Sequence, residues 1–205
     1  GAHVDQTITV TIDGTNDAPD ITAGITDIDY FSEASDASAQ SLSDFGTLSF
    51  SDVDANSNIN VSSTATSTWS GGSLDAALAT TLENGFSIDT SDSTTPGSLN
   101  WSYDVTGVDL DFLADGETIS LDYEVTITDD KGAAATNSFT VTIDGTNDAP
   151  VITSAPIADF GFSEEIDASA QDLFSSGTLS FSDVDANNVI DVSCFPLRHS
   201  ARRRS

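Results

Sequence analysis

The stretch TVTIDGTNDAP occupies residues 9–19 and recurs letter for letter at residues 140–150. In each copy, Val and Ile alternate with Thr before the sequence changes to a run of Asp, Gly, Thr, Asn, Ala and Pro. Alternation with a period of two predicts a strand with one buried and one exposed face. The turn-forming run and its closing proline predict the end of that strand. We therefore expect strands over residues 7–13 and 139–143, each followed by a turn.

The repeated segment DGTNDAP has two interpretations. The first is a simple turn without metal, since Asp, Gly and Asn commonly separate apolar runs. The second is a binding site that requires these particular side chains. A turn alone would accept many substitutes, whereas the whole segment recurs unchanged. Ca²⁺ prefers carboxylate and amide oxygens. The repetition thus favours a calcium-binding joint between domains, with these candidate ligands: Asp13, Asn16 and Asp17 in the first copy, and Asp144, Asn147 and Asp148 in the second.

The repeat extends well beyond this segment. A shift of 131 positions aligns residues 9–62 with residues 140–193 without a gap. So long a period indicates an array of whole domains, because solenoid repeats span only about 20–50 residues. We predict four parts: residues 1–16, a Gly-Ala-His cloning remnant and the last strand of a preceding repeat; residues 17–147, a complete repeat; residues 148–193, the truncated start of the next; and residues 194–205, a tail of foreign composition.

The chain is strongly acidic. It has 34 Asp and Glu against five Lys and Arg, a net charge of -29, and its basic residues other than Lys131 all follow residue 197. Such a surface repels nucleic acid and anionic membranes, and a compact fold with this charge calls for bound cations. No apolar run is long enough to insert into a membrane, and no secretory signal is present at the start. The single cysteine, Cys194, excludes a disulfide framework.

The apolar pattern predicts an all-β fold with one inserted helix. Residues 99–105 and 121–127 alternate so that Leu99, Trp101, Tyr103 and Val105 share one face, as do Leu121, Tyr123, Val125 and Ile127. Residues 73–83 have helical spacing instead, with Ser73 as the predicted cap and Gly85 closing the helix. About seven strands separated by turns indicate a β-sandwich. Asp129 and Asp130 are predicted to form a hairpin turn.

The pieces GSLNWSYDV (97–105), LADGETISLDYEVTITDDKG (113–132) and FTVTIDGTNDAPVI (139–152) resemble VCBS repeats, which occur in tandem in large bacterial surface adhesins. The resemblance covers about residues 4–193 and implies an immunoglobulin-like or cadherin-like β-sandwich. It further implies a calcium-rigidified extender of a secreted RTX-type adhesin, acting at the cell surface or in a biofilm. The partners would then be neighbouring repeats of the same protein.

A second acidic motif, SDVDAN, occurs at residues 51–56 and 182–187. Its alternate positions direct three oxygen donors toward one point: Asp52, Asp54 and Asn56, and again Asp183, Asp185 and Asn187. An EF-hand is excluded, because Ser57 and Ser63 stand where the loop needs its glycine and its bidentate glutamate. Resemblance to cadherin joints adds Glu33 and the pair Asp122 and Glu124 as ligands. The linker reads D-x-x-N-D-A-P where cadherins read D-x-N-D-N-x-P, and this difference leaves the number of ions open.

Other functions remain as alternatives. Acidic loops can simply be solvated, and Trp69 or Trp101 could stack on a glycan, although the position of Trp101 favours core packing. Calcium-dependent self-association is a third possibility. Catalysis is not expected, because His3 and His199 are the only histidines. The truncated repeat is predicted to be poorly ordered or to pair with residues 7–13 of another molecule, since it lacks partners for these apolar residues: Phe160, Phe162, Leu173, Leu179 and Phe181.

Overall fold

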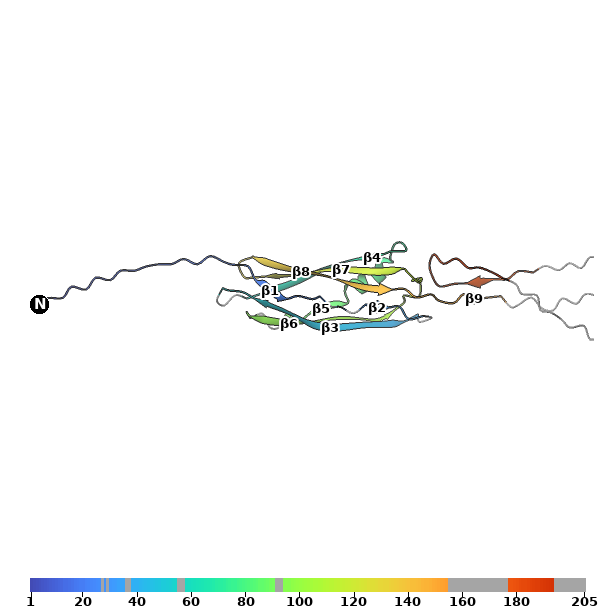
Figure 1. The fold of residues 1–205 in the computed structure, drawn as a ribbon, viewed down its shortest axis with the longest axis horizontal. Coiled ribbons are helices and arrows are strands. Elements are labelled where there is room, and N and C mark those ends of the chain that lie inside the picture. The colour runs from blue at the N-terminus through green and yellow to red at the C-terminus, as the bar shows by residue number, and fades with distance from the viewer. Residues whose placement is uncertain are drawn as a thin grey trace, which may run out of the picture.

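Two four-stranded sheets, packed face to face, form the body of the chain (Figure 1). The computed structural model describes residues 1–26, 28, 30–35, 38–54, 58–90, 94–154 and 177–193. One sheet has the order β1-β3-β6-β5, comprising β1 (Asp20–Ala23), β3 (Gln40–Ser51), β6 (Gly97–Val108) and β5 (Phe86–Ile88). The other has the order β2-β8-β7-β4, comprising β2 (Phe31–Ser32), β8 (Ala134–Asp144), β7 (Thr118–Thr128) and β4 (Asn60–Trp69). The all-β prediction is therefore confirmed, with eight strands in the sandwich.

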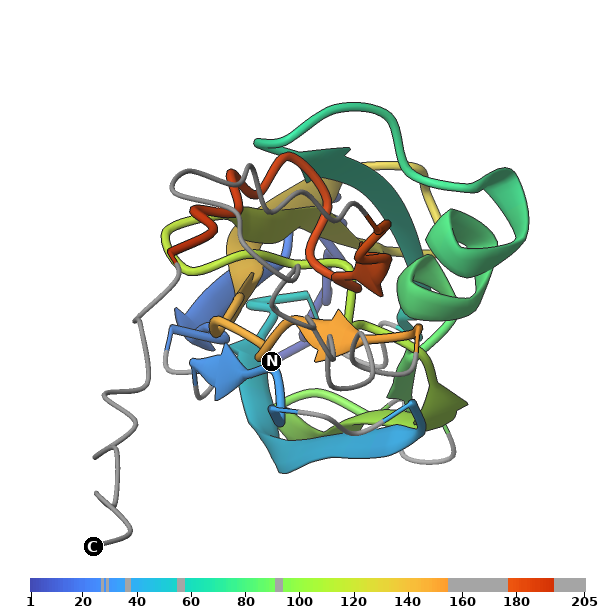
Figure 2. The same ribbon diagram turned by 90° about the vertical axis from the view of Figure 1, so that its right-hand side faces the viewer.

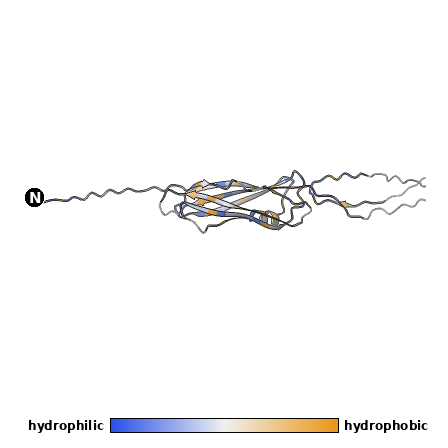
Figure 3. Cartoon of the chain, turned by 60° about the horizontal axis from the view of Figure 1, so that its bottom comes forward, coloured by the Kyte–Doolittle hydropathy of each residue, from blue (hydrophilic) through white to orange (hydrophobic). Residues whose placement is uncertain are grey.

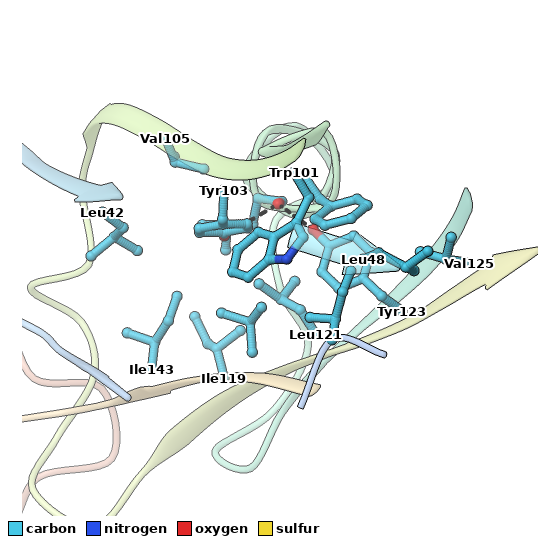
Figure 4. Close-up of a cluster of buried hydrophobic side chains, with 14 of the residues drawn as sticks. Leu42, Leu48, Trp101, Tyr103, Val105, Ile119, Leu121, Tyr123, Val125 and Ile143 are labelled. Carbon is cyan, nitrogen blue, oxygen red and sulfur yellow. Dashed lines mark hydrogen bonds between the residues drawn. The ribbon is translucent and has the colours of Figure 1, made fainter. Parts of the chain in front are cut away.

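The core lies between the two sheets, where both predicted alternations are confirmed. Leu99, Tyr103 and Val105 of β6 are buried, as are the predicted inward residues of β7. Figure 3 shows the hydrophobic positions gathered in the strands of the sandwich. Trp101 is also buried, which agrees with core packing, and its ring contacts the backbone at Gly46, where a Cβ atom would lie 2.6 Å from it. Figure 4 shows these side chains meeting from the two sheets.

The inserted helix α1 (Ala76–Glu83) begins later than predicted. Its cap is Asp75 and not Ser73, because the Asp75 carboxylate accepts the N–H groups of Ala77 and Leu78 at 2.9 and 3.2 Å. The Leu82 carbonyl accepts the hydroxyl groups of Tyr103 and Tyr123 at 3.3 and 3.0 Å (Figure 4). Burial raises the pKa of both tyrosines well above its ordinary value, so they remain neutral donors. The helix is thereby fastened to both sheets.

The two copies of the repeated heptapeptide lie at opposite ends of the sandwich. Residues 1–19 extend from one end as a single thread, and β8 leads into the second copy at the other end (Figure 1). The hairpin between β7 and β8, with Gly132 at φ 93°, lies at the first end and contains Asp129 and Asp130, as predicted. Successive repeats would therefore follow one another along the long axis.

The strand predicted over residues 7–13 is not formed. The side chains of Ile8, Val10 and Ile12 are 82, 78 and 89% exposed, respectively. The identical residues 140–143 belong to β8, where they pair with β7, and Ile143 also pairs with β2. Within the part of the chain that the structure describes, no such partner strands flank residues 7–13, so their alternating pattern has no sheet to join.

The second repeat begins with a strand pair that copies the first. β9 (Val151–Ile152) pairs with β10 (Phe181–Ser182), and Phe181 opposite Ile152 repeats the register of Phe50 opposite Ile21. Phe50 is 1% exposed, whereas Phe181 and Leu179 are each 43% exposed, so the described part of the second repeat leaves both side chains partly uncovered. Phe160, Phe162 and Leu173 lie outside the described residues. Among those described, no helix has the length and apolar character needed to cross a membrane.

Candidate metal centre between the repeats

Acidic side chains converge at the end of the sandwich where β8 leaves. β2 runs parallel to the end of β8, and the N–H of Glu33 donates to the Asp144 carbonyl at 2.8 Å. This pairing directs the Glu33 side chain toward the linker, where its Oε2 accepts the N–H and hydroxyl of Thr146 at 3.0 and 2.5 Å. The first repeat thus holds its own linker through Glu33, which is only 3% exposed.

Two further carboxylates lie beside Glu33. Asp111 comes from the loop that follows β6, and Asp148 comes from the linker. Oxygen atoms of the three side chains lie within 4.8 Å of one another. Asp148 is fully buried and Asp111 is partly buried, so solvent screens this cluster poorly.

The next repeat contributes Asp185. Its Oδ2 accepts the Asp148 N–H at 3.1 Å, and its own N–H donates to Asp183 Oδ1 at 3.2 Å. Asn188 donates to both aspartates, at 3.2 Å to Asp183 and 3.1 Å to Asp185. Asp185 is 6% exposed, so a carboxylate of the second repeat is buried against the linker. Figure 2 looks onto this end, with residues 177–193 in red.

The charges of this cluster are not balanced by a basic side chain. Lys131 is the single Lys or Arg of the described residues, and it pairs with Asp130 at 2.6 Å on the distant β7–β8 hairpin. Two unit charges 4.8 Å apart repel by about 3.5 kcal/mol at an effective dielectric constant of about 20. Three carboxylates at this separation are therefore costly without a cation.

Two buried oxygen atoms also lack a hydrogen-bond donor: Glu33 Oε1 and Asp185 Oδ1. Buried polar atoms are almost always satisfied, so such an atom calls for a ligand. A hard divalent cation takes six to eight oxygen ligands, roughly, and carboxylates are the preferred ones. Glu33, Asp111 and Asp148 could therefore hold a metal ion together, and Asp185 lies beside them, where it accepts the Asp148 N–H.

The pKa of Asp185 gives a pH test. Burial raises this pKa above the ordinary 3.8, while the Asp148 N–H lowers it and the carboxylates of Asp183 and Asp148 raise it further. Because this pKa is raised on folding, the protonated Asp185 carboxyl favours the folded, metal-free joint below pH 3.8. This contribution to stability is lost as the pH rises through the raised pKa. We expect NMR titration of the Asp185 carboxyl carbon in EGTA to give a midpoint above 3.8, which excess divalent cation lowers. A midpoint of 3.8 or less in EGTA would contradict this environment.

The first copy of the heptapeptide shows the downstream half of the same arrangement. The Asp17 N–H donates to Asp54 Oδ2 at 2.8 Å, which repeats the contact between Asp148 and Asp185. The Asp54 N–H donates to Asp52 at 2.9 Å, as Asp185 does to Asp183. Asn16 donates to Asp129 at 2.8 Å. Each linker is therefore held by the repeat that follows it.

Asp129 is a buried residue whose environment differs from that of Asp185. The hydrogen bond from Asn16, with the N–H groups of Ala133 and Lys131, holds the pKa of Asp129 below its ordinary value, although burial opposes this shift. Asp13 is exposed in the extended segment. Asn56 lies outside the described residues. Sequence reasoning assigned Asp129 only to a turn and overlooked its contact with the linker.

The structure does not bring Asp122 and Glu124 to the cluster. Both are exposed in the middle of β7, and Thr140 donates to Asp122 at 2.7 Å. β7 meets the joint at Thr118, which pairs with Asp144, and four residues of strand place Asp122 about 13 Å away. Alternation placed these side chains on the outer face correctly but gave no position along the strand.

Sequence reasoning missed Asp111, which lies where the acidic pair was expected. The sequence feature that could have indicated Asp111 is the Asp109-x-Asp111 pattern directly after a strand. In the structure, the Asp111 N–H donates to Asp109 Oδ1 at 3.2 Å. Other predicted residues lie around the cluster without joining it: Asp144 ends β8, and Asn147 is exposed and donates to the Asp148 carbonyl at 2.7 Å. Asn187 contacts the first repeat instead, through Gly71 and Glu117.

No model of a known protein family and no curated protein sequence matched the chain.

Proposed function

We propose that the chain is part of a tandem array of cadherin-like sandwich repeats, similar to VCBS repeats, in which Ca²⁺ at each joint stiffens the array. The role is mechanical: each repeat acts as an extender of a secreted surface adhesin. The ligands at the joint would be Glu33 and Asp111 of one repeat, Asp148 of the linker and Asp185 of the next repeat. No catalytic step is involved.

The observation that carries this proposal is the buried Glu33 carboxylate. Its Oε2 is used by Thr146, its Oε1 accepts no hydrogen bond, and it lies within a cluster that joins the sandwich to the linker. A purely structural carboxylate at this position would be paired with a basic side chain or fully hydrogen-bonded. The geometry therefore supports a metal ligand.

Bound Ca²⁺ would supply two positive charges where carboxylates of successive repeats meet. Because Asp148 and Asp185 come from the linker and the second repeat, cation binding there would couple the orientation of that repeat to the first. Joints at opposite ends of the sandwich would then produce an extended rod. The net charge of -29 supports the same mechanism, since mutual repulsion keeps unbound segments apart.

X-ray scattering of the chain in Ca²⁺ and in EGTA tests this proposal. We expect Ca²⁺ to increase the maximum dimension and to hold residues 177–193 in line with the sandwich. Removal by EGTA should shorten or bend the particle. Mg²⁺ at equal ionic strength is the control, because it screens charge equally but demands a tighter octahedral site. Identical scattering in all three conditions would rule out calcium-dependent stiffening.

A further inference from the structure

The second repeat also contacts the first through uncharged groups of its own, beside the carboxylate cluster. Ala186 and Asn187 follow Asp185 as the last two residues of the SDVDAN motif, and both contact the end of the first sandwich that faces the viewer in Figure 2. The Ala186 N–H donates to the Phe112 carbonyl at 2.9 Å. Asn187 Nδ2 donates to the Gly71 carbonyl at 3.2 Å and to Glu117 Oε1 at 3.0 Å. One side chain of the second repeat is thus held by two loops of the first.

The surface that receives Asn187 is built from paired side chains. Glu117 Oε2 accepts the indole N–H of Trp69 at 3.1 Å, which fixes the carboxylate that Asn187 contacts. The Trp69 ring meets Phe112 edge to face, with centroids 4.9 Å apart. A Cβ atom at Gly71 would lie 2.5 Å from Glu117 Oε1, so the glycine leaves room for this carboxylate. The receiving surface is therefore Trp69, Gly71, Phe112 and Glu117.

Two properties of the occupant support a specific fit. Asn187 has φ 64°, a left-handed conformation that asparagine tolerates better than most residues. Val184 shares a hollow of about 740 Å³ with Leu78 and Phe112, and it is 54% exposed. Its counterpart Val53, in the first copy of the motif, is 81% exposed. The upstream repeat thus covers part of the motif.

We infer that Asn187 and its receiving surface form a metal-independent latch that orients each repeat on the one before it. The inference rests on the proposed function and deepens it, because the latch acts beside the carboxylate cluster and opposes its repulsion in the absence of a cation. Asn187 is neutral, so its hydrogen bonds do not depend on a bound ion. The partner of the receiving surface is the SDVDAN motif of the succeeding repeat.

Double electron–electron resonance on the whole chain tests the latch. Nitroxide labels are placed at two exposed positions, Thr136→Cys on β8 and Val192→Cys in the second repeat, in a Cys194→Ser background. Asn187→Gly removes the side chain but accepts the left-handed backbone.

In EGTA, we expect the parent chain to retain a population at the distance found in Ca²⁺. Asn187→Gly should lose that population in EGTA, regain it in Ca²⁺, and keep its Ca²⁺ affinity within about threefold, since no proposed ligand is changed. The latch is overturned if Asn187→Gly and the parent agree in EGTA, if the parent has no such population there, or if Asn187→Gly loses Ca²⁺ affinity more than about tenfold.

A change on the receiving side gives an independent check. Gly71→Ala should displace Glu117 and reproduce the Asn187→Gly result in EGTA, whereas Gly72→Ala, whose nearest neighbour would be Trp69 at 3.3 Å, should not. Equal behaviour of Gly71→Ala and the parent would count against the latch. Failure of the calcium proposal can be distinguished from failure of the latch. It would appear as an unchanged distance distribution and no heat of binding when Ca²⁺ is added to the parent.

Discussion

Glu33→Gln is expected to lower the affinity of the joint for Ca²⁺ about 100-fold, equivalent to about 2.7 kcal/mol. The substitution removes one charge from the cluster, and calcium affinity is set largely by the number of charged ligands. The glutamine carbonyl can still accept the N–H and hydroxyl of Thr146, so the local hydrogen bonds persist. Isothermal titration calorimetry measures the loss.

The same substitution should have the opposite effect without metal. In EGTA, Glu33→Gln relieves repulsion from Asp111 and Asp148 and should raise the melting temperature by about 2–4 °C for each kcal/mol relieved. Asp122→Asn is the matched control, since it also removes one carboxylate but lies on the outer face of β7. Equal Ca²⁺ affinity in Glu33→Gln and the parent would exclude Glu33 as a ligand.

Gly145→Ala is expected to destabilise the chain by about 3 kcal/mol, the upper end of overpacking effects. A Cβ atom at this buried glycine would lie 2.5 Å from the Leu113 carbonyl oxygen and still closer to that of Ala114. Both obstacles are backbone atoms, so the linker itself must move. Thr146 and Asp148 follow directly, and Ca²⁺ affinity should fall at least about tenfold.

Gly14→Ala is a closely matched control for this prediction. Gly14 occupies the same place in the identical heptapeptide, but a Cβ atom there meets no atom within 4 Å. We expect its effect on unfolding free energy to stay within about 0.5 kcal/mol. Chemical denaturation compares the two variants. Similar losses in both would show that the packing of Gly145 against residues 113 and 114 is unimportant.

The sandwich could be predicted because alternation determines which side of a strand is buried. Trp101 and Tyr123 were placed inward from this pattern alone, and both are in the core. Helix α1 was predicted, but its start was not, because Ser73 and Asp75 are both good caps and only the folded backbone selects between them. The strand at residues 7–13 was wrong for a different reason: a strand needs a neighbour that the alternating pattern does not supply.

The joint was predicted only in part. Glu33 and Asp148 were chosen through the family resemblance and the repeated heptapeptide, and the structure brings them together. Asp111 was missed because aspartates are common in this chain and the loop that carries it had no distinctive pattern. The contact between Asn187 and Glu117 joins residues 70 positions apart in different repeats, a relation that no local pattern contains.

The most direct measurement is a crystal structure of the chain grown in Ca²⁺, with the ion located by anomalous scattering. We expect an anomalous peak about 2.3–2.6 Å from carboxylate oxygens of Glu33, Asp111, Asp148 and Asp185. Those four side chains turned apart into solvent, with no ion among them, would contradict it.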